Sequence, residues 1–326
     1  MAHWTLDVRT KAGLIVQALW LKTPEGRLDH LKLCATAVIV HWGDPIPTIE
    51  AASRYYDEGH FSKIVIVAND LQECPSALLD TAVSWIIPPR NLGFGGGCNF
   101  GARQYPASKY AFLNSDVTFN RDAISMCLDA LNIPGVGISA PTLYLPNGNL
   151  QSGCGTLSRY MKIARTDIMP IEPINECVWV TGASIFCRHE VFESVGFDGS
   201  YFLGYEDLDI GYRARLAGWK VVLIAGASAI HPARTTLKGA RPVYYGIRNQ
   251  IWFTRRFGSF LGSVGATLYM LRIVPRVLLA DVVKERSPHT PLIYRGLIAG
   301  WRTIPRAGDP LPDEPIPSRW IDWRRD

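Results

Sequence analysis

Three acidic residues within one short segment, Glu206, Asp207 and Asp209, are the first candidates for catalysis. Apolar side chains recur every four residues after them, up to Gly218, and this spacing predicts a helix over residues 206–217. Carboxylates in a first helical turn face unpaired N–H groups and the positive end of the helix dipole, which keeps them ionised near neutral pH. An ionised carboxylate at the mouth of a cleft is suited to act as a general base. The alternative is that Glu206 only starts the helix while the aspartates pair with arginines further along it.

Polar side chains also follow three predicted strands, which cover residues 33–40, 63–68 and 110–113. Because parallel strands end at one edge of a sheet, we expect these side chains to lie together there. Asp116 is a candidate ligand for Mg²⁺ or Mn²⁺, which prefer oxygen ligands, although an aspartate after a strand also commonly caps a turn. The side chains concerned are His41 and Trp42 after the first strand, Asn69 and Asp70 after the second, and Asn114, Ser115 and Asp116 after the third.

A glycine-rich segment, NLGFGGGCNFGA, precedes another predicted helix. Glycines at a helix start let backbone N–H groups approach phosphate oxygens closely, so the segment predicts a phosphate-binding site. A nicotinamide-binding fingerprint fits less well, because the third glycine is missing and the segment follows a short predicted strand at residues 85–87 instead of the first strand. The residues that we single out are Asn91, Gly93, Phe94, Gly95 and Asn99.

The elements that position these residues alternate between buried strands and helices up to about Ala140. This alternation predicts an α/β fold with a doubly wound, mostly parallel sheet. After Pro141 an Asn-Gly pair predicts a hairpin over residues 144–150, and further strands are expected at 179–187 and 219–225. Helices are expected at 243–257 and 260–283. The sequence therefore predicts an α/β core followed by a helical C-terminal region.

Composition indicates a folded protein of 326 residues, with 48% hydrophobic and 19% charged residues. The seven cysteines are scattered and include no C-x-x-C pair, which argues against a disulfide framework or a zinc site and favours the reducing cytoplasm. No secretory signal is expected, since the first apolar run, residues 12–21, is interpreted as an amphipathic helix.

The positive charge is concentrated in the C-terminal part of the chain. Residues 232–326 contain 16 Lys or Arg and 7 Asp or Glu, a net +9, whereas the first 231 residues have a net −4. This distribution suits an anionic membrane surface or a phosphate-bearing partner better than nucleic acid, for which no binding motif is present. Residues 260–271 are too few for a membrane span and predict an interfacial helix, with a buried core helix as the alternative.

Six sequence motifs, which are given in chain order at the end of this paragraph, together resemble glycosyltransferase family 2, in particular its rhamnosyltransferase-like members. The resemblance covers residues 35–231 and continues weakly into residues 245–249. It implies a GT-A fold, a nucleoside-diphosphate sugar donor, a divalent cation (Mg²⁺ or Mn²⁺) and inversion at the anomeric carbon. The motifs are VIVHWGD, NLGFGGGCNFGA, FLNSDV, WVTGASIFCRHEVFESVGFD, YFLGYEDLDIGYRARLAGWK and IHP.

The resemblance also implies roles for individual residues. Asp116 matches the last acidic residue of the family's metal-binding Asp-x-Asp, with Asn114 in its first position, and His231 matches a histidine that completes the metal site. Asp207 matches the catalytic base, with Glu206 in support, while Asp209 is expected to be structural. The glycine-rich segment and the residues after the first three strands match the donor site. The sugar and acceptor pocket is expected to include Thr181, Gly182, Ala183 and Tyr205.

One departure from the family pattern concerns the end of the second strand. The family has Asp-Asn there, with the Asp on the pyrimidine, whereas this chain has Ala68-Asn69-Asp70. The choice between a dTDP-linked and a UDP-linked donor therefore stays open.

We expect the chain to have four parts: a helical N-terminal extension (1–32), a nucleotide-sugar-binding half (33–140), an acceptor-binding and catalytic half (141–231), and a basic amphipathic helical region with an extended tail (232–326). The expected reaction transfers rhamnose or a related sugar to a glycan or a polyprenyl-diphosphate-linked acceptor, in cell-surface polysaccharide synthesis. The enzyme would act at the inner face of the plasma membrane. Two alternatives are a nucleotide-sugar-binding or glycan-binding protein without turnover, and a nicotinamide-dependent oxidoreductase.

Overall fold

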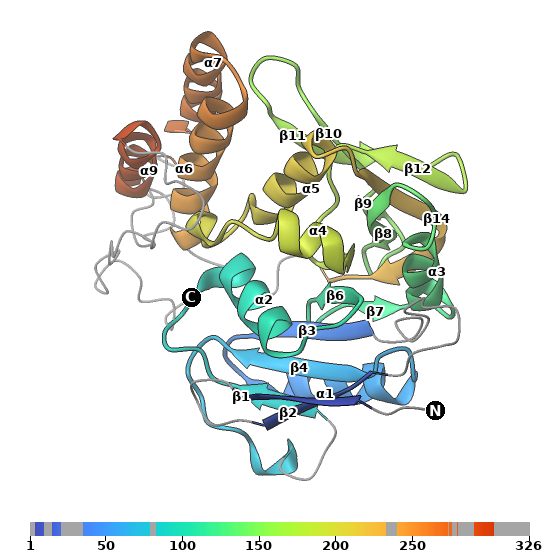
Figure 1. Ribbon diagram of the computed structural model, residues 1–326. Helices are drawn as coiled ribbons and strands as arrows, with labels where there is room; N and C mark the ends of the chain where they lie inside the picture. The colour runs from blue at the N-terminus through green and yellow to red at the C-terminus, as the bar shows by residue number, and fades with distance from the viewer. Residues whose placement is uncertain are drawn as a thin grey trace.

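The computed structural model describes residues 4–9, 15–20, 35–78, 83–232, 240–272, 274–275, 279 and 290–302. Its centre is a ten-stranded sheet (Figure 1). Eight of the strands follow the order β12-β14-β8-β13-β6-β3-β4-β5, and the other two are β7, which pairs with β14, and β9, which pairs with β8. The predicted α/β class is confirmed. The predicted helical C-terminal region is present in the described residues as α6, α7 and α9, which lie beside the sheet (Figure 1).

Four parallel strands form the first half of the sheet, and helices cover both of its faces. Successive side chains of a strand point to opposite faces, so Ile39 packs with α1 while Val38 packs with α2. Strands buried on both faces are almost entirely apolar, which explains the continuous hydrophobic runs of the sequence. The elements are β3 (Ala35–His41), α1 (Pro45–Asp57), β4 (Lys63–Ala68), the 3₁₀ turn η2 (Ser76–Leu78), β5 (Val83–Ile86), α2 (Gly93–Gln104) and β6 (Lys109–Leu113).

The second half of the sheet mixes strand directions. Strand β13 is antiparallel to both of its neighbours, β6 and β8, while β14 runs parallel to β8 and antiparallel to β12. A separate hairpin pairs β10 with β11. The elements are β7 (Thr118–Phe119), α3 (Ala123–Ala130), β8 (Val136–Tyr144), β9 (Leu150–Ser152), β10 (Cys154–Leu157), β11 (Ala164–Ile168), β12 (Ile174–Cys177), β13 (Ser184–Arg188), α4 (His189–Ser194), η3 (Gly199–Tyr201), α5 (Glu206–Leu216) and β14 (Lys220–Ile230).

Three helices follow the sheet: α6 (Ala240–Phe257), α7 (Phe260–Leu271) and α9 (Thr290–Arg302). Helix α6 packs against both of the others, and its buried apolar side chains Ile247 and Ile251 meet Ile293 of α9. None of the described helices combines the length and the apolar composition needed to cross a bilayer.

The structure differs from three expectations. A hairpin of β1 (Trp4–Arg9) and β2 (Ile15–Trp20) lies in the N-terminal extension that was predicted to be helical. Apolar and polar residues alternate strictly in β1, a period of two that favours a strand. Strand β13 begins only at Ser184, because the chain turns at residues 181–183. Helix α7 ends at Leu271 and Arg272 lies in a turn, so the helix predicted over 260–283 is interrupted there; residues 274, 275 and 279 are helical, and the other residues of 273–283 lie outside the described residues.

Candidate active site

The predicted base, Asp207, lies in the first turn of α5 and is tied to a turn far from it in sequence. Its Oδ2 accepts a hydrogen bond from the backbone N–H of Gly182 at 2.8 Å, and its Oδ1 accepts one from Leu208 N–H at 2.8 Å. A Cβ on Gly182 would lie 3.3 Å from Asp207 Cβ and 3.3 Å from the ring of Phe94, so a small residue keeps this approach close. The fold thus brings the predicted base and the predicted sugar pocket together.

Burial raises the pKa of Asp207, and the hydrogen bonds that its carboxylate accepts from two backbone N–H groups lower it in part. As a whole residue, Asp207 is nevertheless only partly buried. A carboxylate that is held in place and has a raised pKa is well matched to proton abstraction near neutral pH.

Glu206 has a different environment although it is the next residue. Its side chain is buried, and Oε2 has no hydrogen-bond partner among the described residues. Burial first, and the neighbouring charge of Asp207 second, raise the pKa of Glu206 to about 8. The expectation that every first-turn carboxylate stays ionised is therefore wrong for Glu206, because desolvation outweighs the helix dipole. The side chain packs against Gly95 of α2, whose Cβ would lie 3.2 Å from Glu206 Cβ.

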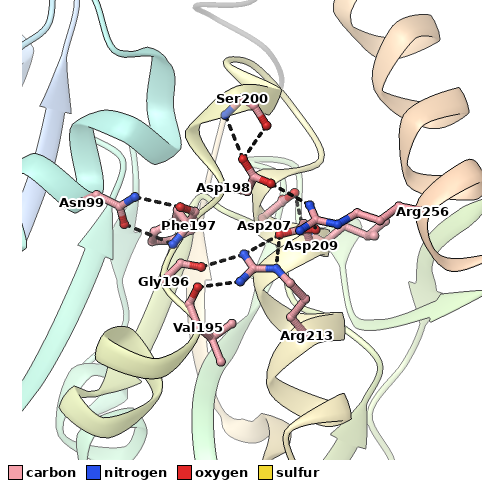
Figure 2. Close-up of polar contacts among 11 residues, drawn as sticks. Asn99, Val195, Gly196, Phe197, Asp198, Ser200, Asp207, Asp209, Arg213 and Arg256 are labelled. Atoms are coloured by element: carbon pink, nitrogen blue, oxygen red, sulfur yellow. Dashed lines mark hydrogen bonds and ion pairs between the residues drawn. The ribbon is translucent and has the colours of Figure 1, made fainter. Parts of the chain in front are cut away.

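Asp209 is fully buried and belongs to an ion-pair network (Figure 2). Its carboxylate lies 2.5 Å from Arg213 Nη2 and 3.4 Å from Arg256 Nη1, and Arg256 Nη1 also lies 2.6 Å from Asp198 Oδ2. Arg213 donates in addition to the carbonyls of residues 195 and 196. These bonds connect α5, α6 and the loop before α5, which gives Asp209 a structural position.

The predicted metal ligands Asp116 and His231 meet at the same sheet edge. Asp116 Oδ1 lies 3.2 Å from His231 Nε2, while His231 Nδ1 lies 3.0 Å from Gln151 Oε1. A carboxylate oxygen and an imidazole nitrogen thus lie side by side, and divalent cations accept both as ligands. The carboxylate and imidazole donor set therefore fits a divalent cation.

The sequence did not point to Gln151, which is 80 residues from its partner. No larger metal cluster is present in the described part of the chain, where no three His, Cys, Asp or Glu side chains gather in a metal-binding arrangement.

The Asp116–His231 pair and the predicted base, Asp207, are connected through the turn at residues 181–183. Asn114 N–H donates to Ala183 O at 2.9 Å, and Leu113 of β6 pairs with Ser184 of β13. The loop that carries Asp116 therefore lies beside the turn whose Gly182 binds Asp207. Thr181 is partly exposed in this turn, whereas Ala183 is buried.

The phosphate-binding interpretation of the glycine segment is not supported by its hydrogen bonds. Leu92 N–H donates to Asn69 Oδ1 at 2.8 Å, Gly93 N–H to Asn91 Oδ1 at 2.9 Å, and Phe94 N–H to Phe202 O at 2.9 Å. The first N–H groups of α2 thus have acceptors within the protein, and Gly93 lies so close to the Phe202 carbonyl that a Cβ would clash with it at 2.2 Å. The glycines allow close packing of α2 instead.

Several other predicted donor residues also bond within the protein. His41 is buried with its Nδ1 2.8 Å from Thr48 Oγ1, and Asp70 Oδ2 accepts Gly43 N–H at 2.7 Å. Asn69 Nδ2 donates to Gly93 O at 3.0 Å, and Asn99 exchanges two hydrogen bonds with the backbone of Phe197. These hydrogen bonds hold the side chains in place at the sheet edge. Trp42, Asn114 and Ser115 are at least partly exposed, and Tyr205 donates its hydroxyl to Gln250 Oε1 at 2.6 Å.

Comparison with family models gave no match. Among curated proteins, the chain is 29% identical over 195 residues to the pre-mycofactocin glycosyltransferase of Mycobacterium tuberculosis, a match that covers 56% of this chain and 40% of the relative. It is 26% identical over 137 residues to the N-acetylglucosaminyl-diphospho-decaprenol L-rhamnosyltransferase of the same organism, covering 36% of this chain and 45% of the relative. The chain thus spans less than half the length of these relatives.

Two solved structures share the fold. GalNAc-T7 with UDP, GalNAc and Mn²⁺ superposes with a TM-score of 0.52 at 12% identity, over 78% of this chain and 58% of the other. TarS residues 1–349 of S. aureus in complex with UDP superposes with a TM-score of 0.50 at 12% identity, over 82% and 80%. The predicted GT-A fold is confirmed, and the sequence resemblance to glycosyltransferases, including a rhamnosyltransferase, is confirmed as well.

Proposed function

We propose that this chain is an inverting glycosyltransferase that moves a sugar from a nucleoside-diphosphate donor to an acceptor hydroxyl. The observation that carries the proposal is the position of Asp207, a carboxylate fixed by Gly182 N–H at the edge where Asp116 meets His231. In this arrangement residues 33–140 bind the donor, and residues 141–231 bind the acceptor and supply the base.

The reaction is a single displacement at the anomeric carbon. The acceptor oxygen forms a bond to C1 as the bond between C1 and the diphosphate oxygen breaks, and Asp207 takes the acceptor proton. Gly182 N–H keeps one carboxylate oxygen fixed during the transfer. Asp116 and His231 would hold a Mg²⁺ or Mn²⁺ ion, and this cation would neutralise charge on the leaving diphosphate.

The finer parts of the proposal are the sugar, the nucleotide of the donor and the acceptor. A rhamnosyl or related sugar is supported by the relative that is named a rhamnosyltransferase, and a UDP link by the TarS complex, which has this fold and contains UDP. The name of the rhamnosyltransferase relative also supports a polyprenyl-diphosphate-linked acceptor. A second candidate, sugar-nucleotide or glycan binding without turnover, is favoured by the single aspartate in the metal motif, where Asn114 replaces the other.

We expect the His231→Ala variant to bind UDP in the presence of Mn²⁺ at least about tenfold more weakly than the wild type, because it removes one of two proposed protein ligands. Titration calorimetry with UDP, with and without Mn²⁺, measures this difference. The control is His189→Ala, which changes a histidine whose ring packs near Tyr110, away from Asp116. Equal Mn²⁺ dependence in His231→Ala and the wild type would remove His231 from the metal site. A donor and acceptor screen with the wild type then separates the enzyme from the binding protein.

We also propose that an anionic membrane surface binds the first turn of α7. Phe260 and Leu261 are 72% and 80% exposed, and Tyr160, 68% exposed, lies beside them because its carbonyl packs against Gly262. The loop that carries Tyr160 and the start of α7 lie together in Figure 1. Residues 232–326 carry a net charge of +9, which complements an anionic bilayer.

Membrane binding is tested by cosedimentation with vesicles that contain phosphatidylglycerol. The double change Phe260→Ser with Leu261→Ser should lower binding by about tenfold or more, since each apolar side chain is worth about 1.5–3 kcal/mol when buried. Ile171→Ser is the matched control, because Ile171 is also strongly exposed but lies between β11 and β12. Equal binding of both variants would refute the assignment of this surface, and equal binding to phosphatidylcholine vesicles would refute the charge argument.

A further inference from the structure

The loop that leads into the proposed base, residues 199–205, has an unfavourable backbone. Phe202 has φ 62° and ψ −53°, and Leu203 N–H donates to Tyr201 O at 2.7 Å, which together make a γ-turn with a positive central φ. Gly204 and Tyr205 follow with φ 78° and 79°. Non-glycine residues rarely adopt these conformations, which persist only where surrounding contacts hold them.

Asn249 of α6 supplies such contacts to this loop. Its Nδ2 lies 3.0 Å from Tyr201 O, 3.1 Å from Leu203 O and 2.7 Å from Gly204 O, so its two hydrogens are shared among three carbonyls. The side chain is fully buried, where a lost hydrogen bond leaves carbonyls without a replacement partner.

Arg248 fixes the orientation of the Asn249 amide. Its Nε donates to Asn249 Oδ1 at 2.9 Å, which turns Nδ2 toward the loop, and its Nη2 donates to Ser200 O and Tyr201 O. The guanidinium lies 4.0 Å from the ring centre of Trp252, which restricts its own position. Both residues belong to the weakly matching segment at 245–249, to which the proposed reaction assigned no role.

The loop connects Asn249 directly to the start of α5. Gly204 and Tyr205 immediately precede Glu206, and Tyr205 O accepts Asp209 N–H at 2.8 Å in the first turn of the helix. The direction in which α5 begins, and with it the distance from Asp207 to Gly182, depends on the path of these residues. A shift of about 1 Å in a reacting group is enough to lower a rate about 100-fold.

We propose that Asn249, oriented by Arg248, is a positioning residue. It holds the loop at residues 199–205 so that Asp207 keeps its hydrogen bond from Gly182 N–H. The inference rests on the proposed function for its effect on catalysis, but the contact between Asp207 and Gly182 is measurable without any activity. Asn249 touches neither the proposed metal pair nor Asp207 itself.

The test compares Asn249→Ala with Arg255→Ala, a control on the same helix. Arg255 donates to Gly300 O at 2.8 Å and Trp301 O at 3.0 Å, so its loss weakens the contact with α9 and leaves the loop intact. We expect Asn249→Ala to lower kcat by about 10- to 100-fold with an unchanged KM for the donor, and Arg255→Ala to change kcat by less than about twofold.

The readout that does not need turnover is hydrogen exchange at Gly182 N–H. This amide should lose protection in Asn249→Ala and keep it in Arg255→Ala. Asn249→Ser, which retains one donor, serves if the alanine variant does not fold, and it should show a smaller loss. Unchanged protection at Gly182 in the folded variants, or a kcat equal to that of Arg255→Ala, would overturn the inference. Absence of transfer by the wild type, with Gly182 protection lost in Asn249→Ala, would instead count against the proposed function alone.

Discussion

The Asp207→Asn variant should have its kcat for sugar transfer lowered by about 10²–10⁴-fold, the usual contribution of a general base. Asparagine has nearly the same shape, and its amide oxygen still accepts Gly182 N–H, so the turn keeps its position, while its NH2 group replaces the oxygen that accepts Leu208 N–H. What is lost is the ability to take a proton. Binding of UDP with Mn²⁺ should therefore stay within about twofold of the wild type, and steady-state kinetics together with calorimetry measure both quantities.

The matched control is Glu206→Gln. The raised pKa of Glu206, about 8, keeps this buried side chain protonated at pH 7, and glutamine reproduces its neutral form. We expect kcat at pH 7 to change by less than about tenfold. If Glu206→Gln lost activity while Asp207→Asn retained it, the roles of the two residues would be reversed. The base must be ionised to work, so activity of the wild type should fall as pH falls through the raised pKa of Asp207.

The Arg256→Met variant should be destabilised by about 3–5 kcal/mol, the usual effect of removing one member of a buried ion-pair network. Arg256 Nη1 lies 2.6 Å from Asp198 Oδ2 and 3.4 Å from Asp209 Oδ1, and both carboxylates are almost completely inaccessible to solvent. Methionine fills much of the volume, so the loss reports mainly on uncompensated charge. Urea unfolding measured with the same probe in both proteins gives the difference in free energy.

The matched control for this prediction is Arg165→Ala. Arg165 pairs with Asp167 at 3.0 Å, but both side chains are more than half exposed, so solvent screens the pair. Its removal should change the free energy of unfolding by about 0–1 kcal/mol. Similar losses in the two variants would show that the buried network does not stabilise the loop before α5.

Helix and strand positions were determined largely by local sequence. The continuous apolar strands around Val38 and Ile66 predicted a sheet covered on both faces, and the spacing after Glu206 predicted α5 to within one residue of its observed end at Leu216. These predictions succeed because side-chain periodicity is a property of neighbouring residues. The rule that parallel strands end at one edge also predicted that Asp116 would lie near other polar groups there.

The burial and the hydrogen-bond partners of each polar group were decided only by the tertiary structure. Glu206 and Asp207 are neighbours in one helix turn, yet one is enclosed against Gly95 while the other faces Gly182. Burial depends on residues more than 20 positions away, and no local pattern records it. The same reason explains why Asn69 proved to be bonded to the glycine segment, 23 and 24 residues further along the chain.

The sequence by itself thus determined the order of the elements, the α/β fold and the set of residues able to do the chemistry. The tertiary structure decided which of those residues meet, which are desolvated, and which backbone N–H groups are already satisfied. It also identified Asn249, because a buried amide that bonds three carbonyls some 45 to 48 residues earlier is visible only after the chain has folded. Periodicity is local, whereas hydrogen bonding and desolvation depend on contacts between distant parts of the chain.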